Sequence, residues 1–430
     1  MKKESITLRI ILISAIIFVL LIPLFMIESL ITERQSYRND AIKEVSKSWA
    51  GSQVVGGPVL TLHSTIENVD QKGNSFFINK NYHYLPDTLE YLVEVTPEKR
   101  HRGIYEIMLY SAKINIRGSI NLEKIKERFQ NQKYDESYLS INISDLRGIQ
   151  NDPQLKINQS VYSLLPGLKS KEVYSSGLFS DVNINEQTNK LDFSLDIQLN
   201  GLDNLSFLPV GKSTALNVKS SWNNPSFSGA YLPSVREINQ NGFSANWRVN
   251  YFNRSFPQNW EDDKENISPS AFGVKFLLPV DEYQKTMRIS KYGLMIIVLT
   301  FLSFFMIELF SKRVIHPIQY LLVGLALVIF YSLLLSISEY VTFAYSYLFS
   351  ALLVISLVGF YVKSIYKSLK IGSIMFGILI GVYGLMYVIL QIQDYSLLVG
   401  NIVLFLVLAL IMFLTRKLNW YDVLSSKSNL

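Results

Sequence analysis

The sequence predicts a membrane protein with α and β parts: an N-terminal signal-anchor helix, a large, mostly antiparallel β domain outside the cytoplasm, and a C-terminal bundle of five transmembrane helices. Two observations support this fold class. Apolar residues are 49% of the 430 residues, but they form long uninterrupted runs only near the two ends of the chain. Between these runs apolar and polar residues alternate with period two, which is typical of strands with one buried face.

Six apolar runs are long enough to cross a bilayer, since a spanning helix needs about 20 residues. These runs are 9–30, 292–311, 318–337, 343–362, 371–390 and 396–415. The first begins at Arg9, after Lys2 and Lys3, and no small-residue cleavage site comes after it. It is also longer than the roughly 7–15 apolar residues of a cleaved signal peptide. We therefore predict an uncleaved signal anchor.

Lysine and arginine near the ends of the spans predict the orientation, because short cytoplasmic segments retain these residues. On the predicted inner side they are Lys312, Arg313, Lys363, Lys367, Lys370, Arg416 and Lys417. The alternate turns contain neither residue type. We expect both termini in the cytoplasm and four regions: 1–31 with the first span, 32–288 in the periplasm, 289–415 as the five-helix bundle, and 416–430 as a cytoplasmic tail.

The same bias accounts for the net charge of +6. Residues 32–291 are close to neutral, so nucleic acid is not an expected partner. The chain has no cysteine, which excludes disulfides and thiolate nucleophiles. The β domain must therefore be held together by its own apolar core, which its size permits.

The predicted periplasmic region begins with a helix. Residues 32–49 lack glycine and proline and carry an apolar residue at every fourth position from Tyr37 to Trp49, so we expect an amphipathic helix that continues the first span. Glycine and proline at 56–58 cannot continue it. Alternating patterns then predict strands over 103–120, 137–146, 190–199 and 213–222, with a short helix over 122–130.

Residues 221–249 contain Trp222 and Trp247 among many turn-forming residues. The sequence NQNG at 239–242 predicts a hairpin turn, because Asn and Gly tolerate positive φ. The main interpretation is that both tryptophans anchor the core of the β domain. The alternative is an aromatic binding surface for a glycan, a lipid or a protein.

Sequence motifs indicate no catalytic, cofactor-binding or metal-binding residues. Catalytic motifs with their expected context and glycine-rich phosphate loops are absent. His63, His83 and His101 lie in the predicted periplasmic region and His316 on the inner side, too far apart in sequence for a local metal motif. A triad of histidines brought together by folding is the minor alternative.

Five ionisable residues are expected near the outer ends of the spans: Glu28, Arg288, Lys291, Glu339 and Asp394. Charges at this depth are costly unless they pair or reach the interface. We hypothesise that Arg288 or Lys291 pairs with at least one of the three carboxylates; the alternative is that all five are separate interfacial anchors. At the inner side, a local pair explains Glu308 and Lys312, which are four residues apart.

Small residues recur at i, i+4 spacing in the fifth span, at Ser373, Gly377 and Gly381. Such a face lets another helix approach closely. We favour packing within the bundle over dimerisation, because five closely connected spans must pack against one another.

Several stretches together resemble the CreD family of bacterial inner-membrane proteins, which are described as cell-envelope integrity proteins. They include SWAGSQVVGGPVL, GLDNLSFLPVGKSTALNVKSSWNNPSFSGAYLP, GFSANWRV, FGVKFLLPVDEYQKTMRISKYG and QDYSLLVGNIVLFLVLALIM. The resemblance covers nearly the whole chain. It implies one N-terminal span, a large periplasmic domain, a multi-span bundle, expression linked to a two-component sensor, and tolerance of β-lactams and envelope stress. It implies no catalytic residues and no cofactor.

The expected function is therefore a non-enzymatic role in envelope integrity at the bacterial inner membrane. A transporter or lipid-handling protein is the first alternative, and an envelope hydrolase is the second. Expected partners are membrane lipids and envelope proteins or glycans, and the oligomeric state is left open.

Overall fold

The computed structural model describes residues 6–69, 74–129, 134–184, 188–277, 282–311, 313–391 and 396–416. The chain forms two compact units. We call Asn39–Pro279 the β domain, and Met1–Arg38 together with Val280–Leu430 the membrane unit. The contacts group residues 32–38 and 282–288 with the membrane unit.

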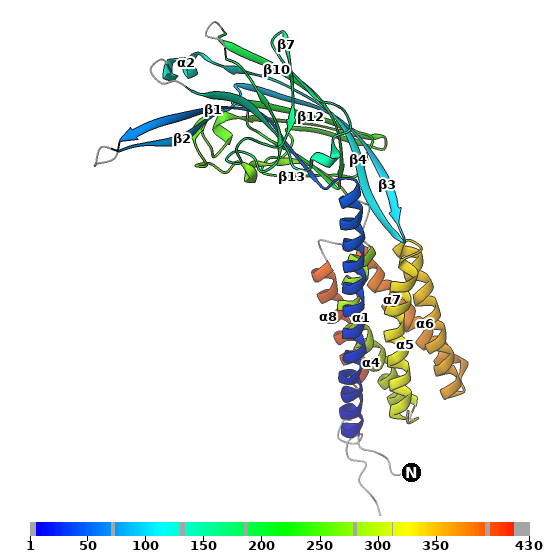
Figure 1. Cartoon of the computed structure of the whole chain (residues 1–430). Coiled ribbons are helices and arrows are strands. Elements are labelled where there is room, and N and C mark those ends of the chain that lie inside the picture. The colour runs from blue at the N-terminus through cyan, green and yellow to red at the C-terminus, as the bar shows by residue number, and fades with distance from the viewer. Residues whose placement is uncertain are drawn as a thin grey trace, which may run out of the picture. The chain divides into compact units, whose positions relative to one another are not determined.

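The β domain contains two sheets, which we call sheet A and sheet B (Figure 1). Sheet A consists of β13 (Pro225–Gly229), β17 (Phe272–Phe276), β11 (Asn204–Leu208), β1 (Gln53–Val69), β5 (Glu136–Ile143), β9 (Gly177–Asp181) and β8 (Leu165–Pro166), with β2 (Ser75–Tyr84) on β1 and β16 (Asn259–Glu261) on β2. Sheet B consists of β14 (Val235–Asn239), β15 (Gly242–Asn250), β12 (Ser213–Ser220), β3 (Thr88–Arg102), β4 (Tyr105–Asn121), β10 (Lys190–Leu202), β6 (Gln154–Ile157) and β7 (Ser160–Ser163). Four short helices occur between strands along the chain: α2 (Glu123–Phe129), η1 (Leu146–Gly148), η2 (Tyr251–Asn253) and η3 (Ser268–Ser270).

Most strand pairs are antiparallel, as predicted; β1 with β11 and β3 with β12 are parallel. The four strands predicted from alternation correspond to β4, β5, β10 and β12, and the predicted short helix corresponds to α2. The NQNG hairpin is also confirmed, because Asn239 pairs with Gly242 across the turn between β14 and β15. Gly242 has φ of 137°, a backbone conformation that side chains rarely adopt.

The core of the β domain lies between the two sheets. Strand β10 shows how the sequence pattern produces this core. From Lys190 to Leu199 the odd-numbered residues are buried, and the even-numbered residues are exposed or half-buried. Tyr91 of sheet B crosses the core, with its ring 5.0 Å from that of Phe207 in sheet A. Its hydroxyl accepts a hydrogen bond from the Gly57 amide at 2.7 Å and donates to the Leu208 carbonyl at 2.9 Å. Complete hydrogen bonding makes this buried hydroxyl tolerable.

Helix α1 (Ile6–Ser48) is continuous from the first apolar run into the β domain, as predicted. Its last turns pack on sheet B. There Ile42, Val45 and Trp49 contact a small apolar cluster. The cluster consists of Ile107, Leu109 and Leu202. The amphipathic pattern of the sequence therefore marks the part of α1 that the β domain covers.

The membrane unit contains α3 (Glu282–Lys291), α4 (Gly293–Ser311), α5 (Pro317–Ser338), α6 (Phe343–Tyr366), α7 (Leu369–Gln391) and α8 (Ser396–Thr415) (Figure 1). In the described chain α1 and α4 to α7 are long and apolar enough to cross a membrane, and α8 contributes a shorter apolar stretch, Leu398–Phe413. Helix α3 was not predicted, because its polar face interrupts the hydropathy signal. Its other face, with Tyr283 and Ile289, is buried.

Helix α1 packs closely on the bundle where two glycines leave room. Leu24 lies over Gly293 of α4, and Leu20 lies over Gly324 of α5. A β-carbon at Gly324 would come within 2.1 Å of a Leu20 methyl group. Glycine therefore permits the close approach of the two helices.

Candidate functional site

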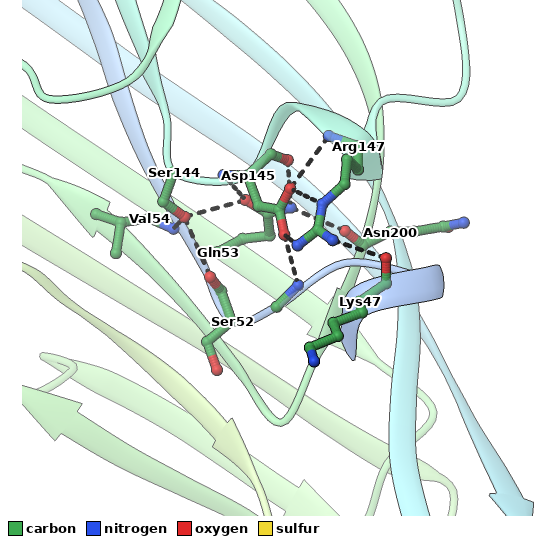
Figure 2. A network of polar contacts seen from close by, with 9 residues as sticks. Lys47, Ser52, Gln53, Val54, Ser144, Asp145, Arg147 and Asn200 are labelled. Atoms are coloured by element: carbon green, nitrogen blue, oxygen red, sulfur yellow. Dashed lines mark hydrogen bonds and ion pairs between the residues drawn. The ribbon is translucent and has the colours of Figure 1, made fainter. Parts of the chain in front are cut away.

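A polar network fixes the chain where α1 gives way to β1 (Figure 2). Asp145 precedes η1, and its carboxylate accepts hydrogen bonds from Nε and Nη2 of Arg147 at 2.9 and 2.6 Å. The Gly51 amide also donates to it at 2.9 Å, and Arg147 Nη1 donates to the Lys47 carbonyl at 2.7 Å. The hydrogen bonds from Arg147 lower the pKa of Asp145 to about 2. Asp145 is therefore ionised at any physiological pH.

Gln53 completes this network from inside the domain. The side chain is fully buried, and its Nε2 donates to the carbonyls of Asp145 and Asn200 at 2.9 and 3.1 Å. Its Oε1 accepts from the Asp145 amide and the Ser144 hydroxyl, each at 3.1 Å (Figure 2). Both donors and both acceptor positions of the amide are used, as a buried amide requires. Gln53 thus links the start of β1 to η1 and to β10.

A chain of hydrogen bonds crosses β1 and β2 of sheet A. The His83 ring is buried, with Nδ1 3.0 Å from Thr61 Oγ1 and Nε2 3.0 Å from the Glu172 carboxylate. Asn81 donates to the same carboxylate from Nδ2 at 2.8 Å, and the Trp260 ring lies 5.6 Å from the imidazole. Burial lowers the pKa of His83, although the charge of Glu172 acts in the opposite direction. The imidazole is therefore neutral near pH 7.

This chain has the order hydroxyl, imidazole, carboxylate of a catalytic triad. Thr61 is only 1% exposed, however, so no substrate carbonyl reaches its hydroxyl in this conformation. His63 joins the chain through Asn81, at 2.8 Å, whereas His101 lies exposed beside Glu106 in sheet B. The minor alternative of three assembled histidines is wrong for this conformation. Across the described ranges, no group of three His, Asp or Glu side chains is arranged to hold a metal ion.

The outward face of sheet B contains a groove of about 460 Å³. Strands β12, β3, β4 and β10 form its floor, and Asn151 of the loop before β6 lies at its wall. Its exposed or half-buried lining residues are Leu92, Glu94, Lys113, Asn115, Asn151, Asp196, Gln198, Asn217 and Lys219. None of these was singled out from the sequence, because the polar ones on strands resemble solvent-facing strand residues and Asn151 resembles an ordinary loop residue.

The two tryptophans of residues 221–249 differ in burial. Trp247 is 2% exposed within the core, and its Nε1 donates to the Tyr231 carbonyl at 3.2 Å. Trp222 is half-buried, with Nε1 donating to the Asn224 carbonyl at 3.0 Å and the Lys99 ammonium 5.7 Å above its ring. The structure places Trp247 as a core anchor, whereas Trp222 lies at the edge of the core.

The predicted interfacial charges are partnered differently from the hypothesis. Glu339 lies 3.7 Å from Arg34 of α1, and Glu28 lies 3.4 Å from the Ser290 hydroxyl. Among the described residues, neither Arg288 nor Lys291 pairs with either carboxylate. The cation beside Glu339 is thus Arg34, from the amphipathic part of α1. Asp394 lies outside the described residues, so a pair between it and Arg288 or Lys291 stays a prediction.

A buried ion pair in the membrane unit was missed. Glu308 of α4 pairs with Arg9 of α1, and these side chains are 7% and 15% exposed. The Tyr320 hydroxyl donates to Glu308 at 2.9 Å, and the Ile315 amide donates at 3.3 Å. The predicted partner Lys312, four residues from Glu308, lies outside the described residues. The signal was available, since Arg9 and Glu308 both fall at the predicted inner ends of spans.

The small residues of α7 are not where they were expected. Ser373, Gly377 and Gly381 are exposed, and a β-carbon at either glycine would contact nothing within 4 Å. The preference for packing within the bundle is therefore wrong among the described residues. The opposite face of α7 is the packed one, with Met375, Leu379 and Tyr383 in the core.

Comparison with known proteins agrees with this architecture. The family model described as Inner membrane protein CreD matches residues 5–421. The chain belongs to the CreD family. Inner membrane protein CreD of Escherichia coli (strain K12) is 30% identical over 417 residues, which cover 94% of this chain and 91% of that protein. The CreD resemblance is thereby confirmed, and with it an inner membrane protein with several apolar helices.

Proposed function

We propose that this CreD-family protein supports cell-envelope integrity, and with it tolerance of β-lactams and other envelope stress, without being an enzyme. Both termini lie in the cytoplasm and the β domain lies in the periplasm. The observation that carries the proposal is the junction at Asp145: a large β domain follows a membrane helix directly and is tied to the last turn of that helix. Such a junction suits a domain that must stay attached at the membrane surface.

The orientation is tested with reporter fusions. The distribution of Lys and Arg supports a cytoplasmic report after Lys370 and a periplasmic report after Gln150. A cytoplasmic report at Gln150 would contradict the proposed placement of the β domain.

The function is tested by deleting the gene and challenging the cells with β-lactams, detergent and osmotic stress. We expect sensitivity that the wild-type gene restores, and weaker restoration by Asp145→Asn at equal protein level. Asp192→Asn is the matched control, since Asp192 is 60% exposed and pairs only at the surface with Lys190. Unchanged tolerance in the deletion strain would remove the proposal.

Transport or lipid handling is the second candidate, and the buried Arg9–Glu308 pair favours it, because ionisable groups inside a bundle often mark pathways. It predicts a defect confined to one solute or lipid, and loss of that activity in Glu308→Gln with the envelope phenotype unchanged. An envelope hydrolase is the third candidate. Hydrolysis of envelope material by the purified protein, abolished in Thr61→Ala, would establish it instead.

A further inference from the structure

The groove on sheet B has the size of a ligand site. Its volume of about 460 Å³ falls in the range of roughly 300–1,000 Å³ that small-molecule sites occupy. The side chains on its floor come from four adjacent strands, so the paired backbones hold them at fixed spacing. A floor of this kind suits a binding site, because the backbone needs no ordering when a ligand binds.

One row of the groove carries unused hydrogen-bonding capacity. Lys219, Glu94, Lys113 and Gln198 are direct neighbours across β12, β3, β4 and β10. Opposite charges in such positions commonly pair. Here, within the described part of the chain, none of the four side chains forms an ion pair or a hydrogen bond with the protein. Their donors and acceptors remain available to a ligand.

The next row is partly preorganised. Asn115 Nδ2 donates to Asp196 Oδ1 at 2.6 Å. Asn151 is fixed by two backbone contacts of β10: it accepts from the Gln198 amide at 2.8 Å and donates to the Asp196 carbonyl at 3.1 Å. Asn217, on β12, makes no side-chain hydrogen bond with any described residue. Leu92 lies between Asn217 and Asn115 and gives the floor one half-buried apolar side chain.

The lining indicates the chemistry of the occupant. Lys113 and Lys219 balance Glu94 and Asp196, so the groove selects for neither an anion nor a cation. Side-chain amides present a donor beside an acceptor, which complements hydroxyl and acetamido groups. The apolar side chain of Leu92 can contact the C–H face of a sugar ring. We propose that the groove binds an uncharged oligosaccharide strand that bears hydroxyl and acetamido groups. This inference rests on the function proposed above, because the β domain would meet such oligosaccharides only if it lies in the periplasm.

The proposal is tested with the full-length protein in detergent micelles and a linear tetramer of N-acetylglucosamine as the probe. Calorimetric titration should give a dissociation constant below about 1 mM. Asn217→Ala and Gln198→Ala should each weaken binding about 2- to 10-fold, the range for one lost hydrogen bond. Asn79→Ala, an exposed position on β2 of sheet A, is the matched control and should bind like wild type.

The salt dependence of the dissociation constant tests the uncharged nature of the ligand independently of the variants. Binding of an uncharged ligand should change less than about twofold between low and high salt, because screening acts on charges. No heat of binding with wild type, equal loss in Asn79→Ala, or a steep fall with salt would each overturn the proposal. Tight binding of a charged peptide at the same residues, without binding of the sugar, would assign the groove to a peptide instead. If the protein binds the sugar but the deletion strain tolerates stress like wild type, the envelope-integrity role is contradicted, whereas oligosaccharide binding by the groove is still supported.

Discussion

Two arginine–carboxylate pairs that contact α1, Arg147–Asp145 in the β domain and Arg9–Glu308 in the membrane unit, lie in different media. In the β domain, Arg147 is 54% exposed while it bridges Asp145 and the end of α1. In the membrane unit, Arg9 and Glu308 are 15% and 7% exposed among apolar helices. Both carboxylates also accept a backbone amide. The chemistry is the same, but water stabilises a broken pair only in the first case.

This difference decides what each pair contributes. A pair with one partner in water typically adds about 1 kcal/mol or less, because water screens the attraction and solvates the exposed partner, here Arg147, when the pair breaks. A buried pair adds little beyond an apolar substitute, but removing one partner leaves a charge without solvation. The bundle pair is therefore expected to be the more sensitive to single substitutions.

The largest effect is expected from Glu308→Ala. The free energy of unfolding should fall by about 3–5 kcal/mol, because Arg9 remains buried without its carboxylate. Unfolding of the helices in mixed detergents, followed by far-UV circular dichroism, measures it. The double variant Arg9→Leu with Glu308→Leu should recover most of the loss. Equal loss in the single and double variants would show that the pair is not the cause.

Trp247→Ala should cost the β domain about 3–5 kcal/mol, since it removes a buried ring that packs 5.6 Å from Phe227 and 6.0 Å from Phe272. Trp222→Ala is the matched comparison and should cost less, because that ring is half-buried. Thermal unfolding followed by the remaining tryptophan fluorescence measures both. If Trp222→Ala keeps the stability of wild type but abolishes stress tolerance, the binding-surface interpretation holds for that ring.

Gly324→Ala should lower the stability of the membrane unit by about 1–3 kcal/mol, because the new methyl group overpacks the contact with α1. Its β-carbon would lie 2.1 Å from Leu20 and 3.0 Å from Phe301. Gly381→Ala on the open face of α7 should change stability by less than about 0.5 kcal/mol. A large loss in Gly381→Ala would instead indicate that another chain covers that face.

Asp145→Asn should destabilise the β domain by about 1–2 kcal/mol, through weaker hydrogen bonds from Arg147 and Gly51. The effect should be smaller than that of Glu308→Ala, since the released arginine is solvated. Chemical denaturation of the two variants in parallel tests this order. The reverse order would contradict the comparison between the two media.

The smallest effect is the pH response of His83, whose pKa burial lowers. A lowered pKa means that the folded state prefers the neutral ring. Stability is therefore complete above the ordinary value of about 6.5, and is lost as pH falls from there through the lowered value. Unfolding of the β domain at several pH values, with Trp260 as a nearby fluorescent reporter, measures the slope. Glu172 and Asp262 also face the ring. In His83→Gln the free energy of unfolding should depend less on pH over this range than in wild type.

Local patterns in the sequence predicted the fold well. Hydropathy located the apolar helices, and alternation located β4, β5, β10 and β12. Partners far apart in sequence were beyond such patterns. The spacing of Glu308 and Lys312 predicts a local pair but does not reveal that Arg9, about 300 residues away, pairs with Glu308. The face of Gly377 and Gly381 was misjudged, since spacing shows that small residues share a face but not which face meets a neighbour.

The candidate sites were predicted least. Thr61 and His83 face each other because β1 and β2 pair in a register that the sequence does not reveal. The groove on sheet B depends on four strands from separate parts of the chain. Its polar residues resemble any solvent-exposed strand face until the sheet order brings them together.

The parallel pairing of β1 with β11 also bears on how the protein is made. Gln53 pairs with Leu205, and β11 in turn pairs with β17, which ends at Phe276. Sheet A therefore cannot close until almost the whole β domain has been synthesised and moved across the membrane in the proposed orientation. Pairings so distant in sequence form slowly. During that interval the segment Gln53–Gly56 of β1 lacks its β11 partner, so we expect this segment to be the place where a foreign strand can pair with the unfinished sheet.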